Sequence, residues 1–565
     1  MKTTSYSYIL IIIFAFSFNV IAKAQQNYHP ERIIIKFKSG SQIFSQLKSL
    51  VPKTPSGSYF TENKRTDQPA LNKFFSYFKI RSIRAVMPDA TTGSLAGGVE
   101  RIFIAEINDG DFLNSVITSL QSSPYIEYAE KDFKGEGSGK KVECSSLEKN
   151  NSSIIPNDPM FNLQWGLRNT GQTVNGSVGI PGADINITNG WNVSTGVESI
   201  KLAILDSGIP PGASEFSGRI LDGYDYANND NDPTDDQGHG TNVTSIAAAK
   251  GNNNSLVAGM NWNCKIIPVK ILDANNSGFY TWWISGITFA ISNGAKVLNM
   301  SVGGSSYSQA LADAVTFAYS SGAVVVVSMM NNNNNIPYYP AAFDNVIAIG
   351  AMNNRNNRAV PFCWGGGSSY GSHIDFIAPG DMILGLDAFN PTLTNYWCGT
   401  SQATPMVSGL ISLMFGVNNT LTFEQVYQKI KEYAVDQIGP PSEDSLGFDS
   451  YFGWGRVNAE ATLNAVNVSV GNYSTSIPET FSLHQNFPNP FNPTTKIRFD
   501  IVRSDFTTII IYDVLGKEVK KLVNEFLTPG SYEVVLNATD YPSGTYHYMV
   551  SSGSFIETKS MIVLK

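Results

Sequence analysis

Apolar residues follow three different patterns along the 565 residues of the chain. In the middle, unbroken apolar runs alternate with stretches in which apolar residues recur at helical spacing. Short runs without alternation are typical of parallel strands buried on both faces, and they predict a three-layer α/β domain with a mostly parallel sheet over residues 157–466. The expected strands are 200–205, 265–271, 297–300, 323–327 and 346–349, and the expected helices are 280–292, 308–321, 404–415 and 422–433.

The last part of the chain, residues 479–565, changes to short segments in which apolar and polar residues alternate, separated by Pro and Gly turns. That pattern predicts an all-β, Ig-like sandwich of antiparallel strands. We expect a loose linker at 467–478 before it. The expected strands are 495–501, 507–512, 531–536, 544–550 and 557–563.

The first part of the chain combines both periodicities. Strand patterns at 32–37, 100–105 and 125–129 surround a helical stretch at 111–122, which predicts a small α+β unit over residues 25–135. Residues 136–156 are rich in Gly, Ser and Lys and contain no long apolar run, so we expect a linker that is accessible to proteases.

Residues 1–24 have the three parts of a secretory signal peptide. Lys2 is followed by an uncharged apolar stretch at 8–20 and then by Ala22-Lys23-Ala24. The alternative is a membrane anchor, but the stretch is shorter than the ~20 apolar residues that span a bilayer. We therefore expect export.

Composition supports export and excludes one class of partner. Charged residues make up only 15% of the chain and the formal net charge is -8, so no basic surface for nucleic acid is expected. The four cysteines are too few for a disulfide scaffold. One pair could form, such as Cys363 with Cys398, but spacing alone does not show it.

Three residues of the α/β domain have the chemistry of a nucleophile, a base and its orienting acid. Asp206 ends a buried strand, at the edge where α/β proteins place their sites. His239 lies between two glycines in Gly-His-Gly-Thr, and Ser401 precedes a helix in Gly-Thr-Ser-Gln-Ala-Thr-Pro. Taken singly, an aspartate such as Asp206 is more often a helix or turn cap, and a serine such as Ser401 is more often a helix N-cap. A Gly-His-Gly motif alone is weak evidence for a catalytic histidine. The other histidine of the domain, His373, is expected to be structural.

Together, the order Asp, His, Ser with these flanking residues resembles the subtilisin-like serine peptidases. The resemblance covers about 310 residues and includes Asn157-Asp158-Pro159, Leu298-Asn299-Met300-Ser301 and Gly453-Trp454-Gly455-Arg456. It implies a secreted serine endopeptidase in which Ser401 attacks the peptide carbonyl, His239 transfers the proton and Asp206 orients the imidazole.

The same resemblance implies an asparagine side chain in the oxyanion hole, and Asn332 aligns best. Here the family's Ala-Ala-Gly-Asn becomes Met329-Met330-Asn331-Asn332, inside a run of five asparagines that leaves the register ambiguous. Further departures are Asn242, Cys398 and Gln402 at positions where the family usually has His, Asn and Met. They leave open the alternative of a catalytically impaired scaffold that serves as a cell-surface binding protein.

Subtilases bind substrate strands between two extended segments, which correspond here to Asn276, Ser277 and Gly278 and to Ser301, Val302 and Gly303. Met329 and Asn331 would then line the S1 subsite and favour an apolar or uncharged P1 residue. Clustered carboxylates before His239 resemble those of calcium-binding subtilases, which implies a structural Ca²⁺ ion held by Asp225, Asp230 and Asp232.

The N-terminal and C-terminal regions of the chain also resemble known protein domains. Residues 25–135 resemble a subtilase propeptide, which implies that they fold with the enzyme and inhibit it until cleavage within 134–155. Gln485-Asn486-Phe487-Pro488-Asn489-Pro490 and the residues that follow resemble the sorting domain of the bacterial type IX secretion system. We therefore expect a monomeric zymogen that crosses the periplasm to the cell surface or the medium, with polypeptide substrates, its own propeptide and the secretion machinery as partners.

Overall fold

The computed structural model describes residues 27–50, 60–61, 68–87, 96–108, 110–142, 155–390, 392–467, 471–474, 478–527, 529–538 and 541–564. The expected signal peptide, residues 1–24, lies outside the described residues. Within the described ranges, none of the helices combines the length and the apolar character needed to cross a membrane.

The central domain is built on a seven-stranded sheet in which all neighbouring strands run parallel, in the order β10-β11-β9-β13-β15-β16-β17. The expected parallel sheet is confirmed. The bounds are β9 (Lys201–Asp206), β10 (Tyr224–Asp225), β11 (Lys265–Lys270), β13 (Val297–Met300), β15 (Val324–Ser328), β16 (Val346–Met352) and β17 (Phe376–Pro379). The chain passes from β9 to β11 on one side and later to β13 on the other, so the carboxyl end of β9 lies at a topological switch point.

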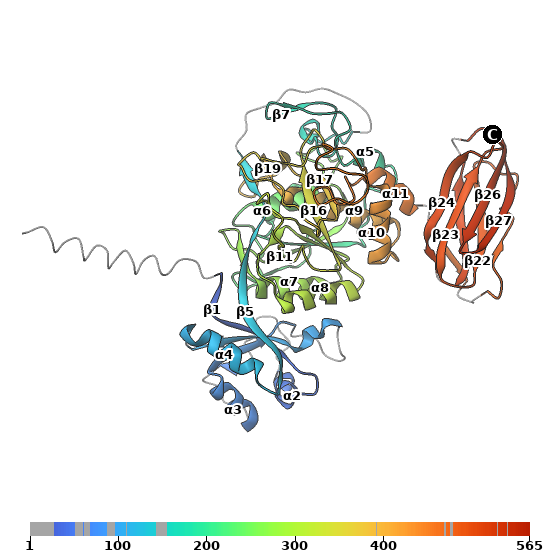
Figure 1. The fold of residues 1–565 in the computed structure, drawn as a ribbon. Helices are drawn as coiled ribbons and strands as arrows, with labels where there is room; N and C mark the ends of the chain where they lie inside the picture. The colour runs from blue at the N-terminus through green and yellow to red at the C-terminus, as the bar shows by residue number, and fades with distance from the viewer. Residues whose placement is uncertain are drawn as a thin grey trace, which may run out of the picture. The chain divides into compact units, whose positions relative to one another are not determined.

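Helices cover both faces of this sheet, as Figure 1 shows. Alternate strand residues such as Leu205 and Leu298 pack into a core with α7 (Tyr280–Ser292) and α8 (Gln309–Ser320). The opposite face carries Asn299, whose side chain accepts a hydrogen bond from Ser408 Oγ on α9 (Thr400–Val417). Both strand faces are therefore buried, which explains the unbroken apolar runs. Further helices are α5 (Ile187–Gly190), α6 (His239–Ala248), α10 (Phe423–Tyr433) and α11 (Ala459–Asn467), and a small hairpin joins β7 (Thr173–Val174) to β8 (Ser177–Val178).

The N-terminal unit is an antiparallel sheet in the order β5-β1-β4-β3-β2, packed against helices over its own apolar core (Figure 1). Its elements are β1 (Tyr28–Phe37), β2 (Phe60–Thr61), β3 (Ile80–Ala85), β4 (Ile102–Ile107) and β5 (Ile126–Gly137), with α2 (Gln42–Ser49), α3 (Pro69–Tyr77) and α4 (Leu113–Gln121).

Strand β5 leaves this unit and continues into the central domain, where it pairs antiparallel with β12 (Ser277–Phe279) and β14 (Val302–Gly303). Residues Lys140–Val142 form β6, which pairs with β19 (Thr394–Cys398), itself paired with β18 (Ile383–Leu386). The prediction of a linker over 136–156 is therefore wrong for residues 136–142, while 143–154 lie outside the described residues. The segment lacks an apolar run because backbone pairing and close approach hold it, and a Cβ on Gly137 would lie 2.3 Å from Asn276 Oδ1.

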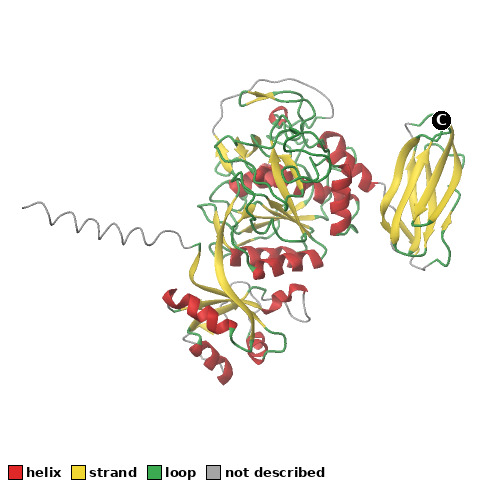
Figure 2. Cartoon of the chain, in the orientation of Figure 1, coloured by secondary structure: helices red, strands yellow, loops and turns green. Residues whose placement is uncertain are grey.

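The C-terminal region consists of two antiparallel four-stranded sheets, β20-β25-β22-β21 and β24-β23-β26-β27, that share one apolar core (Figure 2). The bounds are β20 (Gly471–Ser474), β21 (Ser482–Leu483), β22 (Thr494–Ile501), β23 (Asp505–Tyr512), β24 (Glu518–Leu527), β25 (Gly530–Asn537), β26 (Gly544–Ser552) and β27 (Phe555–Val563). The all-β prediction is confirmed, but β20 falls inside the expected linker at 467–478. Strand β24 was not expected because a register shift in its pairing with β23 buries the adjacent residues Leu522 and Val523, which breaks the alternation.

Candidate active site

Asp206 and His239 form a buried pair at the carboxyl edge of the central sheet. Asp206 is the last residue of β9, and its Oδ1 lies 2.7 Å from His239 Nδ1. Both side chains are fully buried. Burial by itself lowers the pKa of His239, but the charge and hydrogen bond of Asp206 outweigh it and the pKa is raised above its ordinary value. The ring is therefore oriented by a carboxylate that also stabilises its protonated form.

The Gly-His-Gly motif places this ring at the start of α6. Gly238 caps the helix at φ 103°, a conformation that glycine adopts without strain. On the other side of the histidine, a Cβ on Gly240 would lie 2.3 Å from the carbonyl oxygen of Gly208, so only glycine permits this packing. Asp235 completes the turn by accepting hydrogen bonds from the backbone amides of Gly238 and Thr241.

Ser401 lies in the first turn of α9, where the backbone amides of the helix are free to donate. Pro405 has no amide hydrogen, so it cannot bond to the carbonyl of Ser401, and Ser301 Oγ donates to that carbonyl instead, at 3.1 Å. His239 Nε2 is a buried nitrogen for which the described part of the chain supplies no hydrogen-bond partner. A Cβ on Gly139 would lie 3.0 Å from both His239 Nε2 and Ser401 Cβ, so the free nitrogen and the serine flank the same residue.

Residues 134–138 occupy the space between the two segments that the sequence predicts for substrate binding. Ser277 and Gly278 pair with Glu136 and Gly135, and Val302 and Gly303 pair with Gly137 and Glu136. The backbone contacts continue with Gly137 N to Asn276 O at 3.1 Å and Ser138 N to Ser301 O at 2.9 Å. All six predicted substrate-binding residues therefore lie along residues 134–138, and β5 forms the middle strand between β12 and β14.

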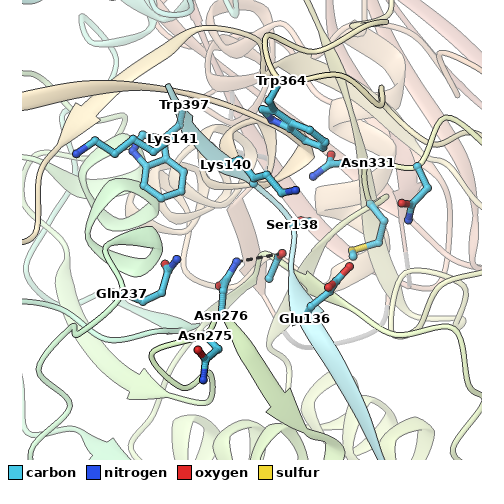
Figure 3. A pocket seen from close by; sticks show the side chains of 14 residues that line it. Glu136, Ser138, Lys140, Lys141, Gln237, Asn275, Asn276, Asn331, Trp364 and Trp397 are labelled. Atoms are coloured by element: carbon cyan, nitrogen blue, oxygen red, sulfur yellow. Dashed lines mark hydrogen bonds between the residues drawn. The ribbon is translucent and has the colours of Figure 1, made fainter. Parts of the chain in front are cut away.

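The carbonyl of Ser138 accepts a hydrogen bond of 2.9 Å from the backbone amide of Ser401. The side chain of Ser138 is buried, with its Oγ 2.6 Å from Ser401 Oγ. Figure 3 shows Glu136, Ser138 and Lys140 on one continuous stretch of chain that runs from β5 into β6, with Asn276 on one side and Asn331 on the other. The chain thus presents its own Ser138–Gly139 peptide bond to Ser401.

The sequence favours Asn332 for the oxyanion hole, but the side chains of Asn331 and Asn332 point to different partners. Asn332 directs its Nδ2 to the hydroxyl of Tyr338, at 2.8 Å. Asn331 is buried, its Oδ1 accepts from Thr400 N at 2.8 Å, and its Nδ2 lies 3.1 Å from the position of a Cβ on Gly399. The left-handed residue of the turn is Met330, at φ 68°. Met330 has the conformation for which glycine is preferred, and the residue that follows this left-handed position is Asn331 and not Asn332.

Two departures from the family pattern contact each other. Gln402 Nε2 donates to Asn242 Oδ1 at 3.2 Å, and both side chains are buried. Cys398 forms a disulfide with Cys363, the pair left open by the sequence, and this bond anchors the strand that leads to Ser401. None of these three departures displaces Asp206, His239 or Ser401.

A cleft of about 450 Å³ lies along residues 136–141, lined by Gln237, Asn275, Asn276, Met330, Asn331, Asn332, Trp364 and Trp397 (Figure 3). Within it, the ammonium group of Lys140 lies 4.7 Å from the centre of the Trp364 ring, and Lys141 forms an ion pair of 2.8 Å with Asp387. The residues after Ser138 are therefore held by side chains as well as by pairing with β19.

The predicted calcium ligands do not converge. Both oxygens of Asp225 accept hydrogen bonds from Asn228, while Asp230 and Asp232 accept from the amides of residues two positions later. Among the described residues, the one group of three metal-ligating side chains within 4.8 Å is Cys363, Asp381 and Cys398, in which the two sulfurs are bonded to each other. The carboxylates that precede His239 thus act as caps of successive turns, and this set does not fit a Ca²⁺ site.

A different pair of carboxylates has the character of a cation site. Asp158 and Glu215 are buried, and Glu215 Oε1 has no hydrogen-bond partner among the described residues. Asn253 contacts both, because its backbone amide points to Asp158 Oδ1 and its Nδ2 donates to Glu215 Oε2 at 2.9 Å. Burial raises the pKa of both carboxyl groups, and the charge of Asp158 adds to the rise at Glu215. Sequence reasoning missed this pair because its members are 57 positions apart, outside any acidic cluster.

Comparison with known proteins adds two family matches. Residues 198–455 match the model of the subtilase family, and residues 485–564 match that of the secretion system C-terminal sorting domain.

Three relatives illustrate the similarity. A thermophilic serine proteinase of Bacillus sp. (strain AK1) is 32% identical over 350 residues, which cover 61% of this chain and 75% of the relative. Thermitase of Thermoactinomyces vulgaris is 33% identical over 306 residues, which cover 54% of this chain and 97% of the relative. Subtilisin DY of Bacillus licheniformis is 36% identical over 267 residues, which cover 46% and 90%.

Proposed function

The chain belongs to the subtilase family and is a subtilisin-like serine peptidase. We propose that it is an endopeptidase that cleaves polypeptides through Asp206, His239 and Ser401, and that it is made as a zymogen. The observation that carries the proposal is the position of Ser138. Its carbonyl accepts from the Ser401 amide while its strand pairs on both sides, as the strand of a bound polypeptide would.

In the proposed reaction, Ser401 Oγ attacks the carbonyl carbon and its proton passes to His239 Nε2, a nitrogen that has no hydrogen-bond partner among the described residues. Asp206 holds the other ring nitrogen at 2.7 Å, which fixes the tautomer and stabilises the imidazolium. His239 then protonates the leaving amine, an acyl group stays on Ser401, and water releases it by the reverse sequence of proton transfers.

The oxyanion that forms in this step needs donors that are already in place. We assign them to the Ser401 amide, which donates to the Ser138 carbonyl, and to the side chain of Asn331. Thr400 supports the second assignment, because its amide and hydroxyl both donate to Asn331 Oδ1 and so orient Nδ2 away from themselves.

The N-terminal unit acts as the propeptide in this proposal. Besides the strand in the cleft, two carboxylates of β5 cap helices of the catalytic domain: Glu130 accepts from Ser308 and the amide of Ala310, and Asp132 accepts from Thr281. These contacts hold the N-terminal unit on the catalytic domain, and self-cleavage at Ser138–Gly139 would allow it to dissociate. N-terminal sequencing of the active enzyme should give Gly139, within the expected range 134–155, whereas an active enzyme beginning at Gln25 would contradict the proposal.

Asp158, Glu215 and Asn253 would hold a Ca²⁺ ion with a structural role. A hard cation prefers oxygen ligands, and it would neutralise two buried carboxylates that have no cationic side chain bonded to their oxygens among the described residues. The guanidinium of Arg219 lies near Glu215 but donates to the backbone carbonyl of Ala248.

The C-terminal sorting domain directs the protein through the type IX secretion system to the cell surface or the extracellular space. The alternative of a catalytically impaired scaffold rested on the run of five asparagines. One member of that run, Asn331, accepts a hydrogen bond from Thr400, the residue before Ser401, which supports the active enzyme. The deciding experiment compares residues 25–565 with the Ser401→Ala variant on a denatured protein substrate. Cleavage by the wild type alone supports the endopeptidase, and equal cleavage by both or cleavage by neither overturns it.

A further inference from the structure

The S1 subsite of this chain is occupied by the side chain of its own Ser138. Because the Ser138 carbonyl lies on the Ser401 amide, this residue is at P1. Its Oγ is 2.6 Å from Ser328 Oγ and 3.3 Å from the carbonyl oxygen of Ser301. The P1 side chain therefore enters between the segment that begins at Ser301 and the segment that begins at Ser328, the two walls of the subsite.

The hydroxyl of Ser328 lies at the depth of the subsite that the Oγ atom of Ser138, the first atom beyond its Cβ, already reaches. At 2.6 Å from Ser138 Oγ, it already makes a short hydrogen bond, and it is itself fully buried. A longer side chain at P1 has to pass Ser328 and continue between the two walls.

Met330 lines the same cleft as Ser138 and lies against the wall that begins at Ser301. A Cβ on Gly303 would lie 2.6 Å from Met330 Sδ and 2.7 Å from its Cγ, so the methionine side chain lies directly on the backbone of the facing wall. Met330 is buried and holds a left-handed φ of 68°, and its carbonyl accepts from the Ser369 amide. Met329, which we expected to line the subsite, packs instead into the core beneath the sheet.

We propose that Ser328 and Met330 limit S1 to small residues, so that this endopeptidase cleaves after serine or alanine and rejects large apolar and aromatic P1 residues. The inference rests on the proposed endopeptidase function and narrows its substrate class. It also replaces our expectation of a generally apolar or uncharged P1 residue, because size rather than polarity decides entry when a side chain closes the subsite.

The test uses the active enzyme obtained by self-processing of residues 25–565. The substrates are peptides with the sequence Glu-Gly-P1-Gly-Lys-Lys, in which P1 is Ser, Ala, Leu or Phe. The wild type should cleave the Ser and Ala peptides with kcat/KM roughly 10–200-fold above the Leu and Phe peptides, the range over which pocket size discriminates. The Met330→Gly variant should raise the Leu and Phe values by a similar factor, with little change for Ala. Glycine adopts φ 68° without strain, so the substitution leaves the turn intact.

Met382→Gly is the matched control, because Met382 is also a buried methionine with a left-handed φ, of 54°, and lies outside S1. It should keep the wild-type preference. Ser328→Ala should lower cleavage of the Ser peptide relative to the Ala peptide. Equal cleavage of Phe and Ser peptides by the wild type, or an unchanged preference in Met330→Gly, overturns the S1 assignment while leaving the endopeptidase intact. A wild type that cleaves neither these peptides nor denatured protein overturns both.

Discussion

The backbone amide of Ser401 donates a 2.9 Å hydrogen bond to the carbonyl oxygen of Ser138, so the chain holds one of its own peptide bonds against its nucleophile. The next residue, Gly139, lies so close to the site that a Cβ there would be 2.9 Å from Gln402 Oε1 and 3.0 Å from His239 Nε2. A P1′ side chain would therefore displace one of these groups or the bond itself.

Gly139→Val should consequently slow self-cleavage at least tenfold, because each 1.4 kcal/mol of strain at the reacting bond is a factor of ten in rate. The measurement is the loss of the full-length band with time after refolding. Lys140→Ala is the control: it removes one cation–π contact to Trp364, adds no atom near His239, and should change the rate only slightly. Rapid cleavage of Gly139→Val at the same bond would show that Ser138–Gly139 is not seated for reaction as proposed.

The two neighbouring asparagines should differ sharply. Asn331→Ala is expected to lower kcat by about 10²–10³ with little change in KM, a size known for the corresponding donor in subtilisin itself. Asn332→Ala should cost little, because it breaks only a hydrogen bond to Tyr338 near the surface. Steady-state kinetics on one peptide measures both. A large kcat loss in Asn332→Ala alone would return the oxyanion role to the residue that the sequence favoured.

The register of these asparagines shows where sequence reasoning reaches its limit. Asp206, His239 and Ser401 could be predicted because each lies in a motif whose glycines or helix start leave a visible pattern. The asparagine that we propose for the oxyanion hole could not, because Met330 holds the left-handed position that glycine usually marks. Without that glycine, the sequence does not distinguish the asparagine directly after the left-handed residue from the next one.

Residues 136–142 illustrate a second limit. A Gly- and Ser-rich segment is indistinguishable from a linker when its partners are backbone groups of β12 and β14, more than a hundred positions away. The choice of calcium ligands met a related limit. Local clustering selected carboxylates that cap their own turns, whereas Asp158 and Glu215 meet only through the fold.

Calcium removal should destabilise the protein through this last pair. If free calcium is 100-fold above its dissociation constant, chelation removes about 2.7 kcal/mol, which corresponds to a fall in Tm of roughly 5–10 °C for a domain of this size. Glu215→Gln should abolish the calcium-dependent part of Tm and weaken calcium binding measured by calorimetry. Asp232→Asn changes one of the turn-capping carboxylates and should keep the full calcium response. A calcium response that survives in Glu215→Gln but disappears in Asp232→Asn would favour the acidic loop instead.

His29 and Asp132, which lie where the N-terminal unit contacts the catalytic domain, respond to acid in opposite directions. Burial, aided by the charge of Arg32, lowers the pKa of His29 from 6.5 to about 4, and its ring packs against Phe279 of the catalytic domain. Phe279 supplies part of this burial and is lost when the unit leaves, so the free unit binds more protons at His29 and acidification below pH 6.5 weakens the association. Burial raises the pKa of Asp132 from 3.8 to about 6, so acidification from pH 6 towards 3.8 strengthens it.

In the wild type these contributions offset each other, and the cleaved unit should remain bound to a similar extent at pH 7.5 and pH 5. Asp132→Asn leaves His29 opposed only by Glu130, so we expect binding up to about tenfold weaker at pH 5 than at pH 7.5. His29→Gln leaves only the carboxylates, including Glu130, whose pKa is also raised by burial, and we expect tighter binding at pH 5. Gel filtration of the self-cleaved protein, blocked with a serine-directed inhibitor, measures the fraction that stays associated. If both variants responded to pH in the same direction, these two residues would not control how acid affects release of the unit.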